Sequence, residues 1–307
     1  MVNYPLLARQ LQDGFYGLPA TPAELEDHLF GMQAVTYSTV AALFFLIYDV
    51  AITFDDEVKY IWPISWGATK IDFFFIRYFP ILFLISIQFY GTPRFTYSNH
   101  DCYIWNTYQA LATILIIAAV DYILLLRVFA LYPGNRRIKY LTWSLYFAEL
   151  ITASVGLGLG VPHLRYDQFC GVFYAPTTFF IAAGVPIVFQ VYLFVITTCK
   201  FIRAVKSGWG TIPILKIIMR DSTWAFTLLF LILVTEAFLY TMAKDAYIGI
   251  LFGWLNAAFS FCGYRILINI NRVGRIRRDA TRTEDFTDGD IEFTTRVSTN
   301  PPESLGG

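Results

Sequence analysis

Long apolar stretches alternate with short polar segments along most of this chain. Seven of the stretches come close to the roughly 20 helical residues that a bilayer core requires. They cover residues 33–54, 71–90, 104–126, 141–161, 177–199, 222–243 and 246–268. The pattern predicts an all-α fold, a bundle of seven transmembrane helices.

The hydrophobic pattern also divides the chain into three parts. Residues 1–32 form a polar N-terminal segment, and residues 33–270 form the predicted seven-helix membrane domain. Residues 271–307 lack apolar periodicity and are punctuated by Gly and Pro. Such a composition buries too little apolar surface to fold, so we predict a disordered tail.

Composition supports a lipid environment. The 307 residues are 56% hydrophobic and 15% charged, whereas soluble domains carry about 25% charged residues. The bilayer is therefore the first expected partner. The formal net charge is zero, so no overall field favours nucleic acid, and we expect none as a partner.

The basic residues predict the orientation of the helices. The N-terminal side of the predicted bundle, with its even-numbered loops, carries four: Arg9, Arg94, Arg165 and Lys244. Up to residue 282, the opposite side carries seventeen: Lys59, Lys70, Arg127, Arg136, Arg137, Lys139, Lys200, Arg203, Lys206, Lys216, Arg220, Arg265, Arg272, Arg275, Arg277, Arg278 and Arg282. Because cytosolic loops are enriched in Lys and Arg, we expect the N-terminus outside and the C-terminus in the cytosol. We expect the plasma membrane, with the endoplasmic reticulum as the alternative.

Two of the four cysteines fall on the predicted outer side. Cys102 begins the third span, and Cys170 lies in the loop between the fourth and fifth spans. Disulfides persist on this oxidising side, so we predict a bridge, with two free thiols as the alternative. The arrangement resembles that of G-protein-coupled receptors. The motifs of their rhodopsin-like class are mostly missing: the third span has no contiguous Asp-Arg-Tyr, and no Asn-Pro-x-x-Tyr follows Asn256.

Ionisable residues inside the spans are costly and mark functional candidates. An inner ionic cluster is predicted on the first three spans. Counting along the helices puts Arg77, Asp49 and Asp121 at similar depth, so Arg77 is expected to pair with Asp49 or Asp121. Asp72 is turned away from that face, and Arg127 ends the third span. The cluster can be a structural salt bridge, a switch that breaks on activation, or part of a proton or ion path.

A second group lies deeper. Glu149 and Glu236 have no cationic residue in their own spans, and Asn256 lies in the seventh. They are candidates for an outward-open ligand pocket, while hydrogen bonds within the bundle are the alternative. His28, His100 and His163 all lie outside the spans, so we expect no metal and no cofactor.

Two stretches resemble a known family. Residues 48–62, with Arg77-Tyr78 downstream, look like the signature of the fungal "domain of unknown function 6533" family, known chiefly from basidiomycetes. Residues 126–132 are similar to a following element of those proteins. The resemblance implies a fungal multi-span membrane protein but no activity. It makes the following residues signature positions: Asp49, Glu57, Trp62, Arg77 and Arg127.

The leading functional hypothesis is a receptor-like protein that senses a small or lipid-like ligand and signals to a cytosolic partner. The topology, the predicted bridge and the basic inner loops favour it. One alternative is a membrane-embedded enzyme resembling isoprenoid cyclases, which would use Glu149 and Glu236 as paired acids. A transporter is another, and a structural or lipid-interacting protein is the last. No catalytic residue is predicted for the leading hypothesis.

Overall fold

The structure is a computed structural model, which describes residues 22–89, 98–132, 134–166, 170, 172–174, 176–206, 227–236, 238–239 and 249–297. These residues are mostly helical. The helices are α2 (Pro22–Ile52), α3 (Phe54–Tyr60), α4 (Ala68–Phe89), α5 (Asn99–Leu131), α6 (Arg136–Gly160), α7 (Thr177–Lys206) and α9 (Phe252–Val297), with a 3-10 turn η1 (Val161–His163) and an unlabelled helix Thr227–Glu236.

Within the described ranges, four helices are long and apolar enough to cross a membrane: Phe30–Ile52, Ala68–Phe89, Asn99–Leu131 and Arg136–His163. Two shorter apolar helices, Gly184–Lys200 and Thr227–Glu236, add to them. The helical character predicted from the sequence is confirmed. The predicted span 222–243 is described only in part, over Thr227–Glu236.

One element is missing from the all-α prediction. The loop between α6 and α7 contains two short antiparallel strands, β1 (Arg165–Tyr166) and β2 (Val172–Tyr174). Strands of two or three residues carry too little alternation to be recognised in a sequence.

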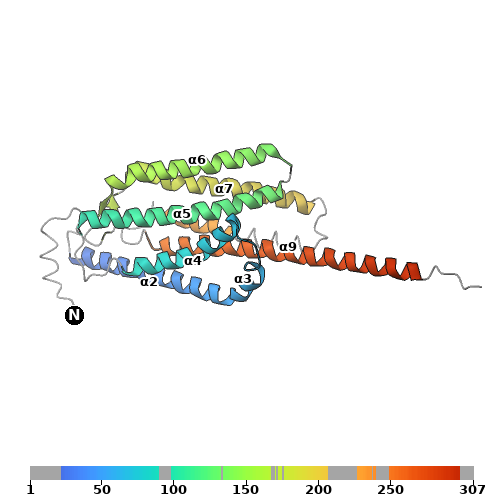
Figure 1. Cartoon of the computed structure of the whole chain (residues 1–307). Helices are drawn as coiled ribbons and strands as arrows, with labels where there is room; N and C mark the ends of the chain where they lie inside the picture. The colour runs from blue at the N-terminus through green and yellow to red at the C-terminus, as the bar shows by residue number, and fades with distance from the viewer. Residues whose placement is uncertain are drawn as a thin grey trace, which may run out of the picture.

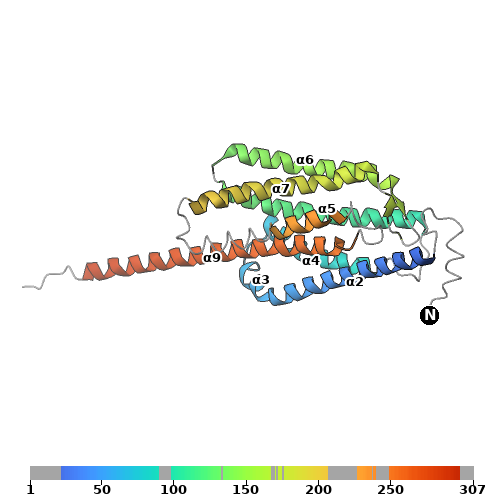
Figure 2. The same cartoon turned by 180° about the vertical axis from the view of Figure 1, so that it is seen from behind.

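The helices run along a common direction, and α9 lies at the centre of one half of the bundle (Figures 1 and 2). It packs against α2, α4 and α5, while α6 packs mainly against α7. The core between them is built from large apolar side chains, among them Phe83, Leu124 and Phe259, all at most 1% exposed. Helix α2 begins at one end of the bundle, and α9 leaves from the other (Figure 1).

The two ends of the bundle differ in the residues they contain. At the basic end, α4 and α6 begin at Ala68 and Arg136, and α5 and α7 end at Leu131 and Lys206. The other end, called the disulfide end, contains Cys102.

The bundle's outward surface is apolar. Large hydrophobic side chains such as Phe44 on α2, Phe147 on α6 and Val188 on α7 are more than half exposed. A surface of this kind suits lipid, where helices satisfy their own backbone hydrogen bonds. Together with the apolar helices, it indicates a membrane protein.

The predicted bridge is present. Cys102 and Cys170 form a disulfide with their Cα atoms 4.9 Å apart. Asn106 reinforces it, because its Nδ2 donates to the carbonyl oxygens of Cys102 at 3.0 Å and Cys170 at 3.2 Å. Nearby, burial raises the pKa of the Tyr166 hydroxyl to about 12. The strand-bearing loop is therefore fixed over the start of α5.

The tail differs from its prediction. Helical backbone continues in α9 to Val297, although the sequence predicts disorder from residue 271. No proline interrupts this stretch before Pro301, and a helix already formed in the bundle propagates more easily than a new one nucleates.

Two glycines permit a test of the packing around α9. A Cβ atom at Gly253 would lie 2.9 Å from the Cα of Thr39 on α2, whereas one at Gly158 on α6 would meet nothing within 4 Å. Gly253→Ala is therefore expected to destabilise the protein by about 1–3 kcal/mol. Gly158→Ala should leave stability unchanged or raise it slightly. Thermal unfolding in detergent checks both, and equal behaviour of the two variants contradicts the close α2–α9 contact.

Candidate functional site

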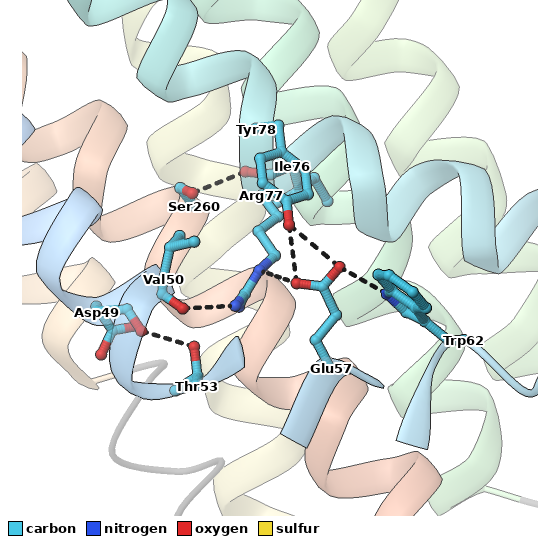
Figure 3. A network of polar contacts seen from close by, with 9 residues as sticks. All are labelled: Asp49, Val50, Thr53, Glu57, Trp62, Ile76, Arg77, Tyr78 and Ser260. Carbon is cyan, nitrogen blue, oxygen red and sulfur yellow. Dashed lines mark hydrogen bonds and ion pairs between the residues drawn. The ribbon is translucent and has the colours of Figure 1, made fainter. Parts of the chain in front are cut away.

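A buried ion pair lies near the basic end. Arg77 on α4 and Glu57 on α3 are at most 1% exposed, and Arg77 Nε lies 2.8 Å from Glu57 Oε2 (Figure 3). A charge removed from water is tolerated only with a partner at close range. The pair therefore fixes α3 against α4.

Glu57 accepts hydrogen bonds from two further side chains. The Tyr78 hydroxyl donates to Oε2 at 2.9 Å, and Trp62 Nε1 donates to Oε1 at 3.2 Å (Figure 3). Arg77 Nη2 in turn donates to the carbonyl oxygen of Val50 on α2 at 3.0 Å. The network thus links α2, α3 and α4 through charge-assisted hydrogen bonds.

Helix α9 closes the network from the other side. The guanidinium carbon of Arg77 lies 4.8 Å from the ring centroid of Tyr264 and 5.7 Å from that of Phe73. Ser260 Oγ donates to the carbonyl oxygen of Ile76 at 2.7 Å (Figure 3). A buried arginine between two ring faces gains cation–π stabilisation. Movement of α9 would therefore disturb Arg77 directly.

A second ion pair joins α2 to α9. Arg265 Nη2 pairs with Asp49 Oδ1, and Arg265 Nε lies 3.4 Å from Asp49 Oδ2. The side chain of Arg265 is 40% exposed, and its guanidinium carbon lies 4.6 Å from the Phe261 ring centroid. This pair is more open to solvent than the pair of Arg77 and so is expected to be weaker.

The predicted pairing of Arg77 with Asp49 or Asp121 is wrong. Arg77 meets Glu57, and Asp49 meets Arg265. Sequence counting placed Glu57 in a loop outside the span, but α3 folds back and buries it. The sequence signal for this short helix is the stretch from Phe54 to Tyr60, which has acidic residues in its first turn and is long enough for two helical turns.

Asp121 lies instead in the other half of the bundle. Gln190 Nε2 on α7 donates to its Oδ1. The buried carboxyl of Glu149 on α6 is close enough to interact with that of Asp121 electrostatically. Both oxygens of Glu149 are buried without a hydrogen-bond partner. Close by, the Tyr146 hydroxyl donates to the carbonyl oxygen of Ala118 at 3.1 Å. Asp121, Glu149 and Gln190 thus lie where α5, α6 and α7 pack together, a region called the carboxyl seam below. The contacts described for its two buried carboxyls involve no cation.

The remaining predicted residues are spread over the bundle. Asp72 is half-buried on α4, and Arg127 is buried near the end of α5. Glu236 is buried on the helix Thr227–Glu236. Asn256 is buried on α9 and donates within its own helix to Phe252 at 2.9 Å. The described hydrogen bonds join no two of Glu149, Glu236 and Asn256.

The described part of the chain contains no group of three or more His, Cys, Asp or Glu that could hold a metal ion. Its chemistry is that of a helical membrane protein with a buried ionic network. Residues 37–82 match the sequence model of a family of unknown function, DUF6533. The match supports the resemblance to that family, over the later part of α2, all of α3 and most of α4. Comparisons with curated proteins and with solved structures gave no match.

The buried pair of Arg77 and Glu57 should be destabilised far more by the loss of one charge than by the loss of one hydrogen bond. Arg77→Gln or Glu57→Gln leaves one charge buried alone, so each is expected to cost about 3–5 kcal/mol. Tyr78→Phe removes only one of the donors to Glu57 and should cost about 1 kcal/mol. Thermal unfolding in detergent measures these effects. Lys59→Gln is the control, because Lys59 neighbours Glu57 on α3 but is exposed; a loss as large as that of Arg77→Gln would contradict the pair.

In the carboxyl seam, removing one of the two carboxyls is not expected to destabilise the protein. Glu149→Gln removes a buried group whose charge has no described cation, so stability should be unchanged or raised by about 1 kcal/mol. Gln190→Leu removes the donor to Asp121 and should cost about 1–3 kcal/mol. Unfolding temperatures of both variants in detergent check this. A marked loss for Glu149→Gln would mean that Glu149 is ionised and paired.

Proposed function

We propose that the chain is a seven-helix membrane receptor with its N-terminus outside and its C-terminus in the cytosol. It senses a small or lipid-like ligand from the disulfide end and signals to a cytosolic partner at the basic end, most simply at the plasma membrane. The excess of Lys and Arg at the basic end favours this orientation. The resemblance to the fungal family adds the proposal of a fungal origin.

The observation that carries the proposal is the ionic network of Glu57 and Arg77. It holds α3, which lies in the first loop at the basic end, against α4 and α9. In the proposed mechanism this network switches between a closed and a broken arrangement, because a buried charge without its partner is strongly disfavoured. A ligand that shifts α9 or α4 would change the shape of the basic end through a defined set of contacts.

The disulfide end suits the receiving role. The disulfide and Asn106 fix the loop between α6 and α7 over α5. A fixed loop presents a preformed surface to a ligand and loses little entropy on binding. Glu149, Glu236 and Asn256 are the polar groups proposed to meet a ligand that enters the bundle from this end.

A proton-coupled transporter is the second candidate, and one observation favours it. Asp121 on α5 and Glu149 on α6 are both buried in the spans, and Asp72 is half-buried on α4. Chains of carboxyls inside a membrane are typical of proton relays. The enzyme alternative gains no comparable support, because no described contact joins Glu149 to Glu236.

The test is to weaken the network and measure signalling. Glu57→Gln, expressed as the full chain with heterotrimeric G proteins, is expected to raise their nucleotide exchange in the absence of added ligand. Each 1.4 kcal/mol removed from the resting arrangement raises the active population about tenfold while that population is small. Lys59→Gln is the matched control and should match the unmodified chain.

Transport is tested in parallel. Proteoliposomes loaded with a pH-sensitive dye should show no proton flux if the chain is a receptor. A flux that Glu149→Gln abolishes, together with no G-protein response to Glu57→Gln, would replace the receptor by the transporter.

A further inference from the structure

The cytosolic ends proposed for α5, α6 and α7 carry a concentrated positive charge. Residues 122–148 and 168–220 contain no Asp or Glu. Within their described parts, six basic residues besides the buried Arg127 gather at the basic end: Arg136, Arg137, Lys139, Lys200, Arg203 and Lys206. The chain segments that carry these residues supply no acidic side chain to offset the concentration. An anion from outside these segments is therefore the natural counter-charge.

Two of these lysines are held in place by aromatic rings. Lys139 Nζ on α6 lies 5.8 Å from the ring centroid of Phe129, and Lys200 Nζ on α7 lies 4.9 Å from that of Tyr132. Phe129 lies in the last turn of α5, and Tyr132 is the residue that caps this helix. The Tyr132 hydroxyl donates to the carbonyl oxygen of Ile196 at 3.0 Å, which fixes this ring against α7.

The turn between α5 and α6 brings the charges together. Gly134 has a φ of 87°, a conformation that L side chains rarely adopt, and the turn is tight enough for α6 to start at Arg136. The first turn of α6 contains no acidic residue. Cations at this end of a helix are repelled by the helix dipole, and a bound anion relieves that repulsion.

Apolar side chains flank the charges on the outward surface. Tyr140 is 73% exposed and Leu141 is 50% exposed at the start of α6, and Ile202 near the end of α7 is 47% exposed. A ligand that spans this boundary needs an anionic head and an apolar body. An anionic phospholipid has both, whereas an acidic protein partner would meet the charges from the aqueous side alone.

We propose that the ends of α5, α6 and α7 bind the headgroup of an anionic phospholipid, with Lys139 and Lys200 as the phosphate contacts. Ammonium groups on ring faces keep N–H donors for phosphate oxygens. The site rests on the bilayer orientation proposed above but needs no signalling activity.

The test uses the full chain in detergent and a fluorescent phosphatidylinositol bisphosphate in mixed micelles, read by anisotropy. Removing one cation near such a headgroup weakens binding about fivefold, so Lys139→Gln with Lys200→Gln should weaken it roughly 25-fold. The control, Lys59→Gln with Arg272→Gln, removes the same charge from α3 and α9 and should bind within about twofold of the unmodified chain. The pair Lys139→Arg with Lys200→Arg keeps both charges and should retain most of the binding.

Several outcomes overturn the proposal. Equal losses in the two double variants would show nonspecific attraction to the whole basic end. Displacement of the probe by soluble inositol trisphosphate as effectively as by the unlabelled lipid would make the ligand a free phosphate. Displacement by an acidic peptide, with no preference for the anionic lipid over phosphatidylcholine, would make the surface a protein-docking site. Nucleotide exchange is measured separately, so loss of lipid binding and failure of the receptor proposal remain distinguishable.

Discussion

A buried arginine in a membrane helix must be neutralised, and much of the fold around α4 follows from how Arg77 meets that requirement. Its partner is Glu57, the one buried residue of α3, whose other side chains are exposed or half-buried. Its remaining contacts reach the Val50 carbonyl on α2 and the Tyr264 ring on α9. Arg77 thereby links four helices, because each of them supplies a group that lowers the free-energy cost of burying its charge.

The same requirement is met differently in the other half of the bundle. Asp121 and Glu149 are both buried there, Gln190 donates an amide hydrogen bond to Asp121, and neither carboxyl is in a described ion pair. Buried polar groups without full hydrogen bonding are costly. The two halves thus differ in how buried polar groups are satisfied: by ion pairs between helices in the α4–α9 half, and by one described amide hydrogen bond in the carboxyl seam.

Sequence reasoning succeeded for properties that depend on the order of residues along the chain. Helix positions follow from apolar length, and the bond between Cys102 and Cys170 followed once both were assigned to one side of the membrane. It failed where the answer depends on which helix faces which. Depth counting paired Arg77 with Asp49 or Asp121, whereas Arg77 pairs with Glu57. It also missed Arg265, which is more than 200 residues away from Asp49 in sequence. Glu149, Glu236 and Asn256 were grouped because each lacked an obvious partner, and that criterion carries no information on proximity.

The extent of the family match is informative in the same physical terms. Residues 37–82 contain both members of the buried pair and the two other donors to Glu57, Trp62 and Tyr78. They exclude Tyr264, Arg265 and the carboxyl seam. The matched segment therefore carries its own charge neutralisation and specifies a helical hairpin with α3 between its arms. Such a hairpin can be kept while the helices packed against it change, because its buried charge, Arg77, already has its partner Glu57 within the hairpin. The resemblance accordingly concerns how this part of the molecule folds, and it carries no information on the helices outside residues 37–82.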